Sequence, residues 1–190
     1  MNKDRLILIT NPGSSSRKYA LYRGNDFLCS LHFEFEGKKV IYTLKKLDGS
    51  KEKRETKLKD LSFVVNNLEK TLTDEGYLNE STKLDAILAR VAAPGSYFAT
   101  DHIVDEECLK QLDIAKERAP LHAPVIASEI EQLRIVFKET LIIAISDSAF
   151  HNDRSEVAKS YAIDTELAQK FDIQRWGYHG LSVGSIVRFM

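Results

Sequence analysis

The chain is 190 residues long and carries 27 Lys and Arg against 28 Asp and Glu, a formal net charge of −1. Balanced charge argues against a nucleic-acid protein that binds through a basic surface, and two cysteines, Cys29 and Cys108, are too few for a disulfide scaffold. The apolar runs are too short for a membrane span, and the N-terminus does not resemble a signal peptide. We therefore expect a soluble, cytoplasmic α/β protein that binds neither nucleic acid nor membrane.

The first part of the chain predicts strands. Residues 6–10 are apolar and β-branched, as in a strand buried on both faces, and residues 11–16 have turn chemistry. Further strands are expected over 18–22, 27–35 and 40–44, and the charged stretch 51–59 is expected at the surface.

From residue 58 onward the apolar residues recur mostly at helical spacing. Three or four antiparallel strands followed by alternating helices and strands predict a mixed sheet with helices packed on it. The expected helices cover 58–73, 106–112, 124–137, 165–171 and a segment starting near residue 181, and the expected strands cover 84–89 and 141–145.

The turn after the first strand is rich in Gly and Ser, and its backbone N–H groups and hydroxyls suit a phosphate. It lacks the second Gly and the Lys-Ser/Thr of a Walker loop, so it predicts a hairpin-type loop. Alternation puts Ser16, Lys18 and Ala20 on one face of the next strand, where Lys18 can reach an anion. A solvated hairpin is the competing interpretation, and composition alone favours it.

Two charged residues follow buried strands, where α/β proteins often bind ligands. Arg90 has a guanidinium suited to a carboxylate or phosphate, although a surface ion pair explains it equally well. Asp147 has the position of a metal-binding or catalytic acid, and a helix N-cap is its competing role.

Two histidines stand before predicted helices. His122 is flanked by Pro120 and Pro124, although a lone His in such a place is more often a cap or a packed side chain. His179 lies between Gly177 and Gly180, and of all the histidines it has the context most typical of a site, because glycines permit close approach by a ligand.

Taken together, these segments resemble the acetate kinase family. The opening signature is carried by residues 9–19, ITNPGSSSRKY, and three further motifs occur in order as APLHAP at 119–124, DSAFH at 147–151 and YHG at 178–180. The resemblance covers essentially the whole chain. It implies an actin-like, sugar-kinase-like ATPase domain with a ribonuclease H-like mixed sheet, over residues 1–150, and the start of a connection to a second nucleotide-binding domain over 151–190.

The resemblance also implies a reaction, in which ATP and acetate or another short-chain carboxylate give an acyl phosphate and ADP with Mg²⁺ present, and a homodimer in the full-length form. It assigns catalysis to Asp147 as the active-site acid, to His179 as the stabiliser of the transition state, and to His122. Because the nucleophile is already ionised, we expect Asp147 to lie beside magnesium or its waters rather than to act as a base. The resemblance further implies a substrate site of Arg90, Ala92, Leu121 and Tyr178, ATP binding by Ser14, Ser16 and Lys18, and a magnesium ligand at Asn11.

The chain departs from the family pattern near these positions. His-Arg-Val-Val-His-Gly-Gly is replaced by ARVAAPG at 89–95, Gly-Thr-Ser-His by GLSV at 180–183, and the Asn after His122 by Ala123. Ala92 stands where the family has a larger apolar residue, which favours a propionate-sized substrate.

Acetate kinases are about twice this length, and the missing domain supplies most nucleotide-binding motifs, so this chain alone is expected to be inactive. Two interpretations stay open: the N-terminal part of an acetate kinase-like enzyme, or a non-catalytic module that binds a carboxylate, a phosphate or a protein partner.

Overall fold

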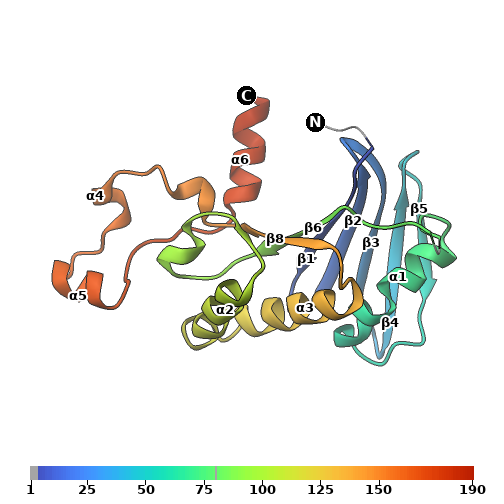
Figure 1. Cartoon of the computed structure of the whole chain (residues 1–190), viewed down its shortest axis with the longest axis horizontal. Coiled ribbons are helices and arrows are strands. Elements are labelled where there is room, and N and C mark those ends of the chain that lie inside the picture. Colours follow the sequence, from blue (N-terminus) through green and yellow to red (C-terminus); the bar gives the residue numbers. More distant parts are fainter. Residues whose placement is uncertain (1–3, 80) are drawn as a thin grey trace. The chain divides into compact units, whose positions relative to one another are not determined.

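The computed structural model describes residues 4–79 and 81–190. Within them, eight strands form a mixed sheet in the order β5-β4-β3-β2-β1-β6-β8-β7 (Figure 1). Strands β1 to β5 pair antiparallel in sequence order, whereas β6 pairs parallel with β1, which confirms the expected mixed sheet. The strands are β1 Leu6–Pro12, β2 Ser16–Arg23, β3 Asp26–Glu36, β4 Lys39–Lys46, β5 Lys51–Glu55, β6 Ala86–Val91, β7 His102–Ile103 and β8 Leu141–Ser146.

The helices alternate with the later strands, as the periodicity predicts. Short 3-10 turns lie at η1 Leu61–Phe63, η2 Ser96–Ala99 and η3 Ala149–His151. The α-helices are α1 Val64–Asp74, α2 Glu106–Arg118, α3 Ala123–Val136, α4 Glu156–Lys159, α5 Thr165–Lys170 and α6 Gly180–Phe189.

The chain divides into two compact units. The first comprises the chain up to Arg90 together with Val125–Ile143, and the second comprises Val91–Pro124 and Ala144–Met190.

In the first unit, α1 and most of α3 lie on one side of strands β1–β5 (Figure 1). Strand alternation turns Leu8 and Leu21 inward, and the helices supply apolar residues such as Leu68 and Ile130, all at most 1% exposed. The apolar spacing of α1 makes one buried face from Val64, Val65, Leu68 and Leu72. The opposite face of β1 and β2 is more open, and it carries Asn11 and Lys18.

The second unit has its own small core, in which Phe98, Cys108 and Leu112 are at most 1% exposed. Helix α2 starts at the N-cap Asp105, whose carboxylate accepts from the N–H of Cys108 at 2.8 Å. At the other end of α2, Arg118 donates to the carboxylate of Asp172 at 3.1 Å and to its carbonyl at 2.6 Å.

Several local expectations need correction. Residues 51–55 are mostly exposed, as expected, yet they form strand β5 because they pair with β4. The first turn is shorter than 11–16, because β1 continues to Pro12 and β2 begins at Ser16. The expected helix 58–73 divides into η1 and α1, and α2 continues to Arg118. The short elements η2, β7, η3 and α4 lack a clear periodicity and were not expected.

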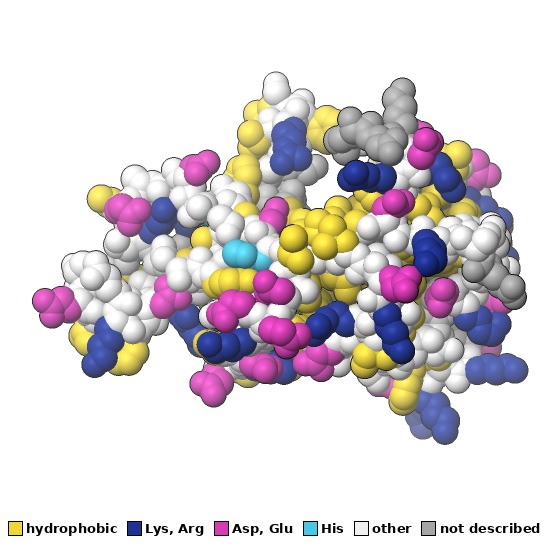
Figure 2. Space-filling view, viewed as in Figure 1, with side chains coloured by type: hydrophobic (Ala, Val, Ile, Leu, Met, Phe, Trp, Pro, Cys, Tyr) yellow, Lys and Arg dark blue, Asp and Glu magenta, His cyan; other side chains and the backbone are white. Residues whose placement is uncertain are grey.

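Acidic and basic side chains are interspersed on the face seen in Figure 2, in keeping with the balanced composition. Among the described helices, none combines the length and apolar character that a membrane crossing requires.

Candidate functional site

A row of polar side chains crosses the open face of the first unit's sheet. Asn11 on β1 lies opposite Lys18 on β2, and Lys18 lies opposite His32 on β3. Arg90, near the end of β6, donates from Nη1 to Oδ1 of Asn11 at 3.0 Å. Three predicted residues, Asn11, Lys18 and Arg90, are therefore brought together, although 79 residues separate Asn11 from Arg90. Two cations beside an amide make this row suitable for an anion.

The Gly-Ser loop is a tight hairpin connection, as predicted. The N–H of Gly13 donates to the carbonyl of Ser16 at 2.9 Å. A Cβ on Gly13 would lie 3.2 Å from that same carbonyl oxygen, so the turn has little room for a larger residue. Ser14 is exposed and Ser16 is half-buried.

A buried ion pair lies on the other face of the same strands. Nε of Arg17 lies 3.1 Å from Oε2 of Glu129 on α3, and the two side chains are 10% and 2% exposed. Arg17 also donates from Nη1 to the carbonyls of Gly13 and Ser16, the latter at 3.3 Å. Neither residue was predicted as a site residue from the sequence. The available signal was a charge in an apolar face: Arg17 alternates with Tyr19 and Leu21, and Glu129 precedes Ile130.

In the second unit, Asp147 holds the start of α6. Its carboxylate accepts from the N–H of His179 at 2.8 Å and of Leu181 at 3.4 Å, and its carbonyl accepts from the N–H of Gly180 at 2.9 Å. The side chain is buried at 1% exposure. The structure thus unites two predicted residues, Asp147 and His179, and gives Asp147 a capping role on a helix distant in sequence.

The turn before α6 requires its glycines. A Cβ on Gly180 would overlap the carbonyl oxygen of Asp147 and lie 2.8 Å from Cβ of Phe150, and one on Gly177 would lie 2.7 Å from the ring of His151. His179 has φ 63° in the left-handed region and is exposed. The tight turn with an exposed imidazole is therefore confirmed.

The other predicted residues lie elsewhere in the second unit. Tyr178 precedes the turn at 40% exposure, and its carbonyl lies 3.0 Å from Nε2 of His151. His122 is exposed immediately before α3, and Leu121 is 78% exposed. Ala92 is half-buried and follows Val91, whose carbonyl accepts from the N–H of Asp147 at 2.8 Å.

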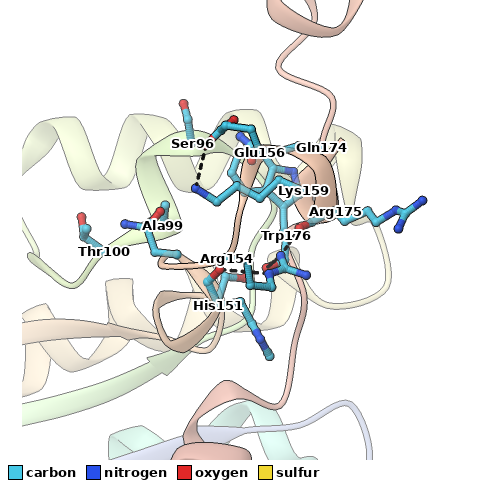
Figure 3. A pocket seen from close by; sticks show the side chains of 12 residues that line it. Ser96, Ala99, Thr100, His151, Arg154, Glu156, Lys159, Gln174, Arg175 and Trp176 are labelled. Carbon is cyan, nitrogen blue, oxygen red and sulfur yellow. Dashed lines mark hydrogen bonds and ion pairs between the residues drawn. The ribbon is translucent and has the colours of Figure 1, made fainter. Parts of the chain in front are cut away.

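In the second unit, His151 lines a cavity of about 340 Å³ (Figure 3). Arg154 lies in its wall and donates to the carbonyls of His151 at 3.0 Å and Trp176 at 3.2 Å, while Lys159 lies 3.3 Å from Glu156. Arg154 therefore ties the backbone just before the Tyr178–His179 turn to that of η3, whereas Lys159 pairs with a neighbouring side chain on α4. The lining residues are Ser96, Ala99, Thr100, Ser148, His151, Asn152, Arg154, Glu156, Lys159, Gln174, Arg175 and Trp176.

Comparison with known proteins decides the family. The acetokinase family model matches residues 6–188. The chain belongs to the acetokinase family. It is 29% identical over 178 residues to the acetate kinase of Oceanobacillus iheyensis and 32% identical over 179 residues to that of Bacillus cereus, covering 93% of this chain and 45% of each relative. The chain thus spans about half the length of these curated relatives.

The fold of this chain is also similar to that of a solved short-chain carboxylate kinase. A propionate kinase from Francisella tularensis superimposes with a TM-score of 0.80 at 28% identity, over 93% of this chain and 45% of that one. The mixed sheet and its flanking helices are consistent with the predicted actin-like ATPase fold.

Proposed function

We propose that this chain is the N-terminal part of a short-chain carboxylate kinase, which transfers the γ-phosphoryl group of ATP to acetate or a close homologue. The observation that carries the proposal is the row of Arg90, Asn11 and Lys18, in a chain of the acetokinase family. The domain division at residue 150 and the homodimer stay predictions.

The chemistry requires charge neutralisation more than a base. A carboxylic acid with a pKa of about 4 is already ionised at pH 7, so the substrate carboxylate can act as the nucleophile without a base to remove its proton. The difficulty is that one anion attacks another, and donors that neutralise the in-line transition state supply the catalysis. We assign Arg90 to the substrate carboxylate, Lys18 and the hydroxyls of Ser14 and Ser16 to ATP, and His179 and His122 to the transferring group.

Asp147 is better suited to positioning than to proton transfer. Its carboxylate already accepts from the backbone of α6, so it fixes the turn that presents His179. We assign Ala92, Leu121 and Tyr178 to the acyl side of the substrate, where the small Ala92 leaves room for propionate.

The residues present fit Mg²⁺ as an ion carried by the nucleotide. The amide oxygen of Asn11 is a suitable hard ligand, and Mg²⁺ usually keeps several waters and binds substrate phosphates. Within the described residues no group of three His, Cys, Asp or Glu side chains forms a cage. When bound, the ion would neutralise phosphate charge, while Arg90 orients Asn11 from 3.0 Å.

The assignments are tested by kinetics in a complete enzyme that contains this chain. Arg90→Ala should raise the acetate KM about 10- to 100-fold, the worth of a hydrogen bond to a charged group. His179→Ala should lower kcat about 10²- to 10³-fold, as for loss of a transition-state donor. Lys83→Ala is the control, because Lys83 is exposed and pairs with the exposed Glu139 at 2.9 Å. Near-wild-type constants for both variants would refute the assignments.

The altered motifs at 89–95 and 180–183 favour a second candidate, a module that binds the carboxylate without catalysis. It predicts acetate binding that depends on Arg90 and no acyl phosphate formation, even when the remainder of a kinase is supplied.

A further inference from the structure

The Gly13–Ser16 loop is held by hydrogen bonds from one buried guanidinium, that of Arg17. Nη1 of Arg17 donates to the carbonyl of Gly13 and, at 3.3 Å, to that of Ser16, the residues that close the turn. The N–H of Gly13 also donates to Ser16 at 2.9 Å. Because these carbonyls point to Arg17, the loop conformation depends on where Arg17 is held.

Glu129 holds Arg17 from α3. The carboxylate lies 3.1 Å from Nε of Arg17, and its side chain is only 2% exposed. Within the described residues neither carboxylate oxygen has a hydrogen bond of standard geometry, and neither do the buried hydroxyls of Thr10 and Tyr19. A buried ion pair is weak evidence for stability, since apolar side chains of similar volume often stabilise a core as well or better. The pair therefore needs another explanation, and its contacts with the loop supply one.

Other groups surround the pair. Tyr19 on β2 and Thr10 on β1 adjoin Glu129, and burial together with Glu129 raises the pKa of Tyr19 well above its usual value. The pKa of Asp60 is lowered mainly by its hydrogen bond from Ser62 and in smaller part by Arg17. Asp60 is therefore a further negative charge that interacts with the guanidinium of Arg17. Burial raises the pKa of Glu129 to about 7, and Arg17 offsets only part of that rise.

We propose that Arg17 and Glu129 are positioning residues for the Gly13–Ser16 loop: Glu129 fixes the guanidinium, and the guanidinium fixes the two carbonyls that set the direction of the loop amides. That this loop receives the phosphates of ATP rests on the proposed function. The positioning itself does not, because it follows from contacts within the first unit.

The test is a pH titration of the ¹⁵N-labelled chain followed by the backbone amides of Gly13, Ser14 and Ser15. In the wild type these amides should shift with a midpoint near pH 7, the pKa of Glu129. Glu129→Gln should remove that transition. Arg17→Met should remove it at the loop while the amides of α3 around residue 129 still titrate, because the link is broken and the carboxyl remains. Arg17→Lys, which keeps the charge but lacks the fork of donors, should reduce the shift.

The controls separate this transition from others. Glu131→Gln changes an exposed carboxylate two residues further along α3 and should leave the loop transition unchanged. His32→Gln removes the histidine that pairs with Lys18 on the open face, so a transition that persists in this variant does not come from His32. Loop amides that do not titrate in the wild type, or that titrate in Glu129→Gln as they do in the wild type, would overturn the proposal. An unreduced loop transition in Arg17→Lys would also overturn it, and this variant serves if Arg17→Met does not fold.

A second arm distinguishes the positioning role from the proposed function. MgATP is added at pH 8 to the wild type and to Arg17→Lys, with the same amides observed. Saturating shifts in the wild type and about tenfold weaker binding in the variant support both proposals. Loop amides that respond to pH but not to MgATP would retain the positioning role and remove the loop from the nucleotide site.

Discussion

Glu129 shows how a single carboxyl can make the stability of this chain depend on pH. Water solvates an ionised carboxylate far better than a protein interior does, so burial favours the protonated form. The pKa of Glu129 accordingly rises from an ordinary 4.5 to about 7 in the folded chain, although Arg17 is close by. Between these two values the folded chain keeps a proton that the unfolded chain has released.

The free energy of unfolding should therefore fall as the pH rises through the window from about 4.5 to about 7, because the folded chain binds more protons there. The fall due to Glu129 is about 3 kcal/mol, since each pKa unit corresponds to about 1.4 kcal/mol. Urea unfolding at several pH values should show this slope in the wild type and a smaller slope in Glu129→Gln. The exposed Glu131→Gln is the control. Equal slopes in Glu129→Gln and the wild type would contradict the prediction.

Gly180 illustrates a steric requirement at the same scale. The backbone of Asp147 and the side chain of Phe150 occupy the space that a Cβ would need. Gly180→Ala should lower the free energy of unfolding by about 1–3 kcal/mol, the usual cost of overpacking. Ser182→Ala, on an exposed position of the same helix, should change it by less than about 0.5 kcal/mol. Thermal unfolding of the two variants compares them, and equal melting temperatures would refute the steric argument.

At the scale of elements, the start of α6 depends on a residue from another strand. Helices leave their first N–H groups without intrahelical partners, and here the carboxylate of Asp147 accepts two of them across 32 and 34 residues of sequence. A carboxylate is also favourable at a helix N-terminus because of the helix dipole. The position of His179 therefore depends on Asp147.

Asp147→Asn should keep the shape of the side chain but weaken this cap. Hydrogen exchange at the amide of His179 should accelerate about tenfold, because a charge-assisted bond is about twice as strong as a neutral one. The amide of Gly180 is an internal control, since it donates at 2.9 Å to the backbone carbonyl of Asp147 and not to the side chain. Unchanged protection of His179 would show that the carboxylate charge does not hold the turn.

At the scale of the whole molecule, we expect the proposed reaction to require groups beyond those of this chain. Curated relatives are covered to 45% of their length, so more than half of each relative has no counterpart in these residues. Phosphoryl transfer depends on groups that surround the γ-phosphate, which one part of such an enzyme supplies incompletely.

An acyl-hydroxamate assay tests this expectation. The chain alone, with MgATP and acetate, should give no acyl hydroxamate above background. Adding the C-terminal part of a related acetate kinase should produce measurable acyl phosphate formation. Propionate should then be used at least as well as acetate, within the factor of about 10–200 that one methylene provides. Turnover by the chain alone would refute the first expectation, and a strong preference for acetate would refute the second.

Local sequence patterns predicted most of the fold. Apolar, β-branched runs and turn residues located β1 to β4, and helical periodicity located α1, α3 and α6. Strand β5 was missed because its charged residues lack alternation, and pairing such as Lys53 with Thr43 on β4 orders it instead. The short turns η2 and η3 have too few residues for a period to be read.

The sequence by itself determined the order of most elements, the hairpin loop, and the placement of Arg90 and Asp147 near the ends of buried strands. Only the tertiary structure decided which of these residues meet. Arg90 reaches Asn11 because β6 returns parallel beside β1, and Arg17 meets Glu129 because α3 covers the inner face of β2. Local patterns report periodicity and burial. Contacts between residues far apart in the chain depend on strand order and on which helix covers which face, and these are set only when the sheet assembles.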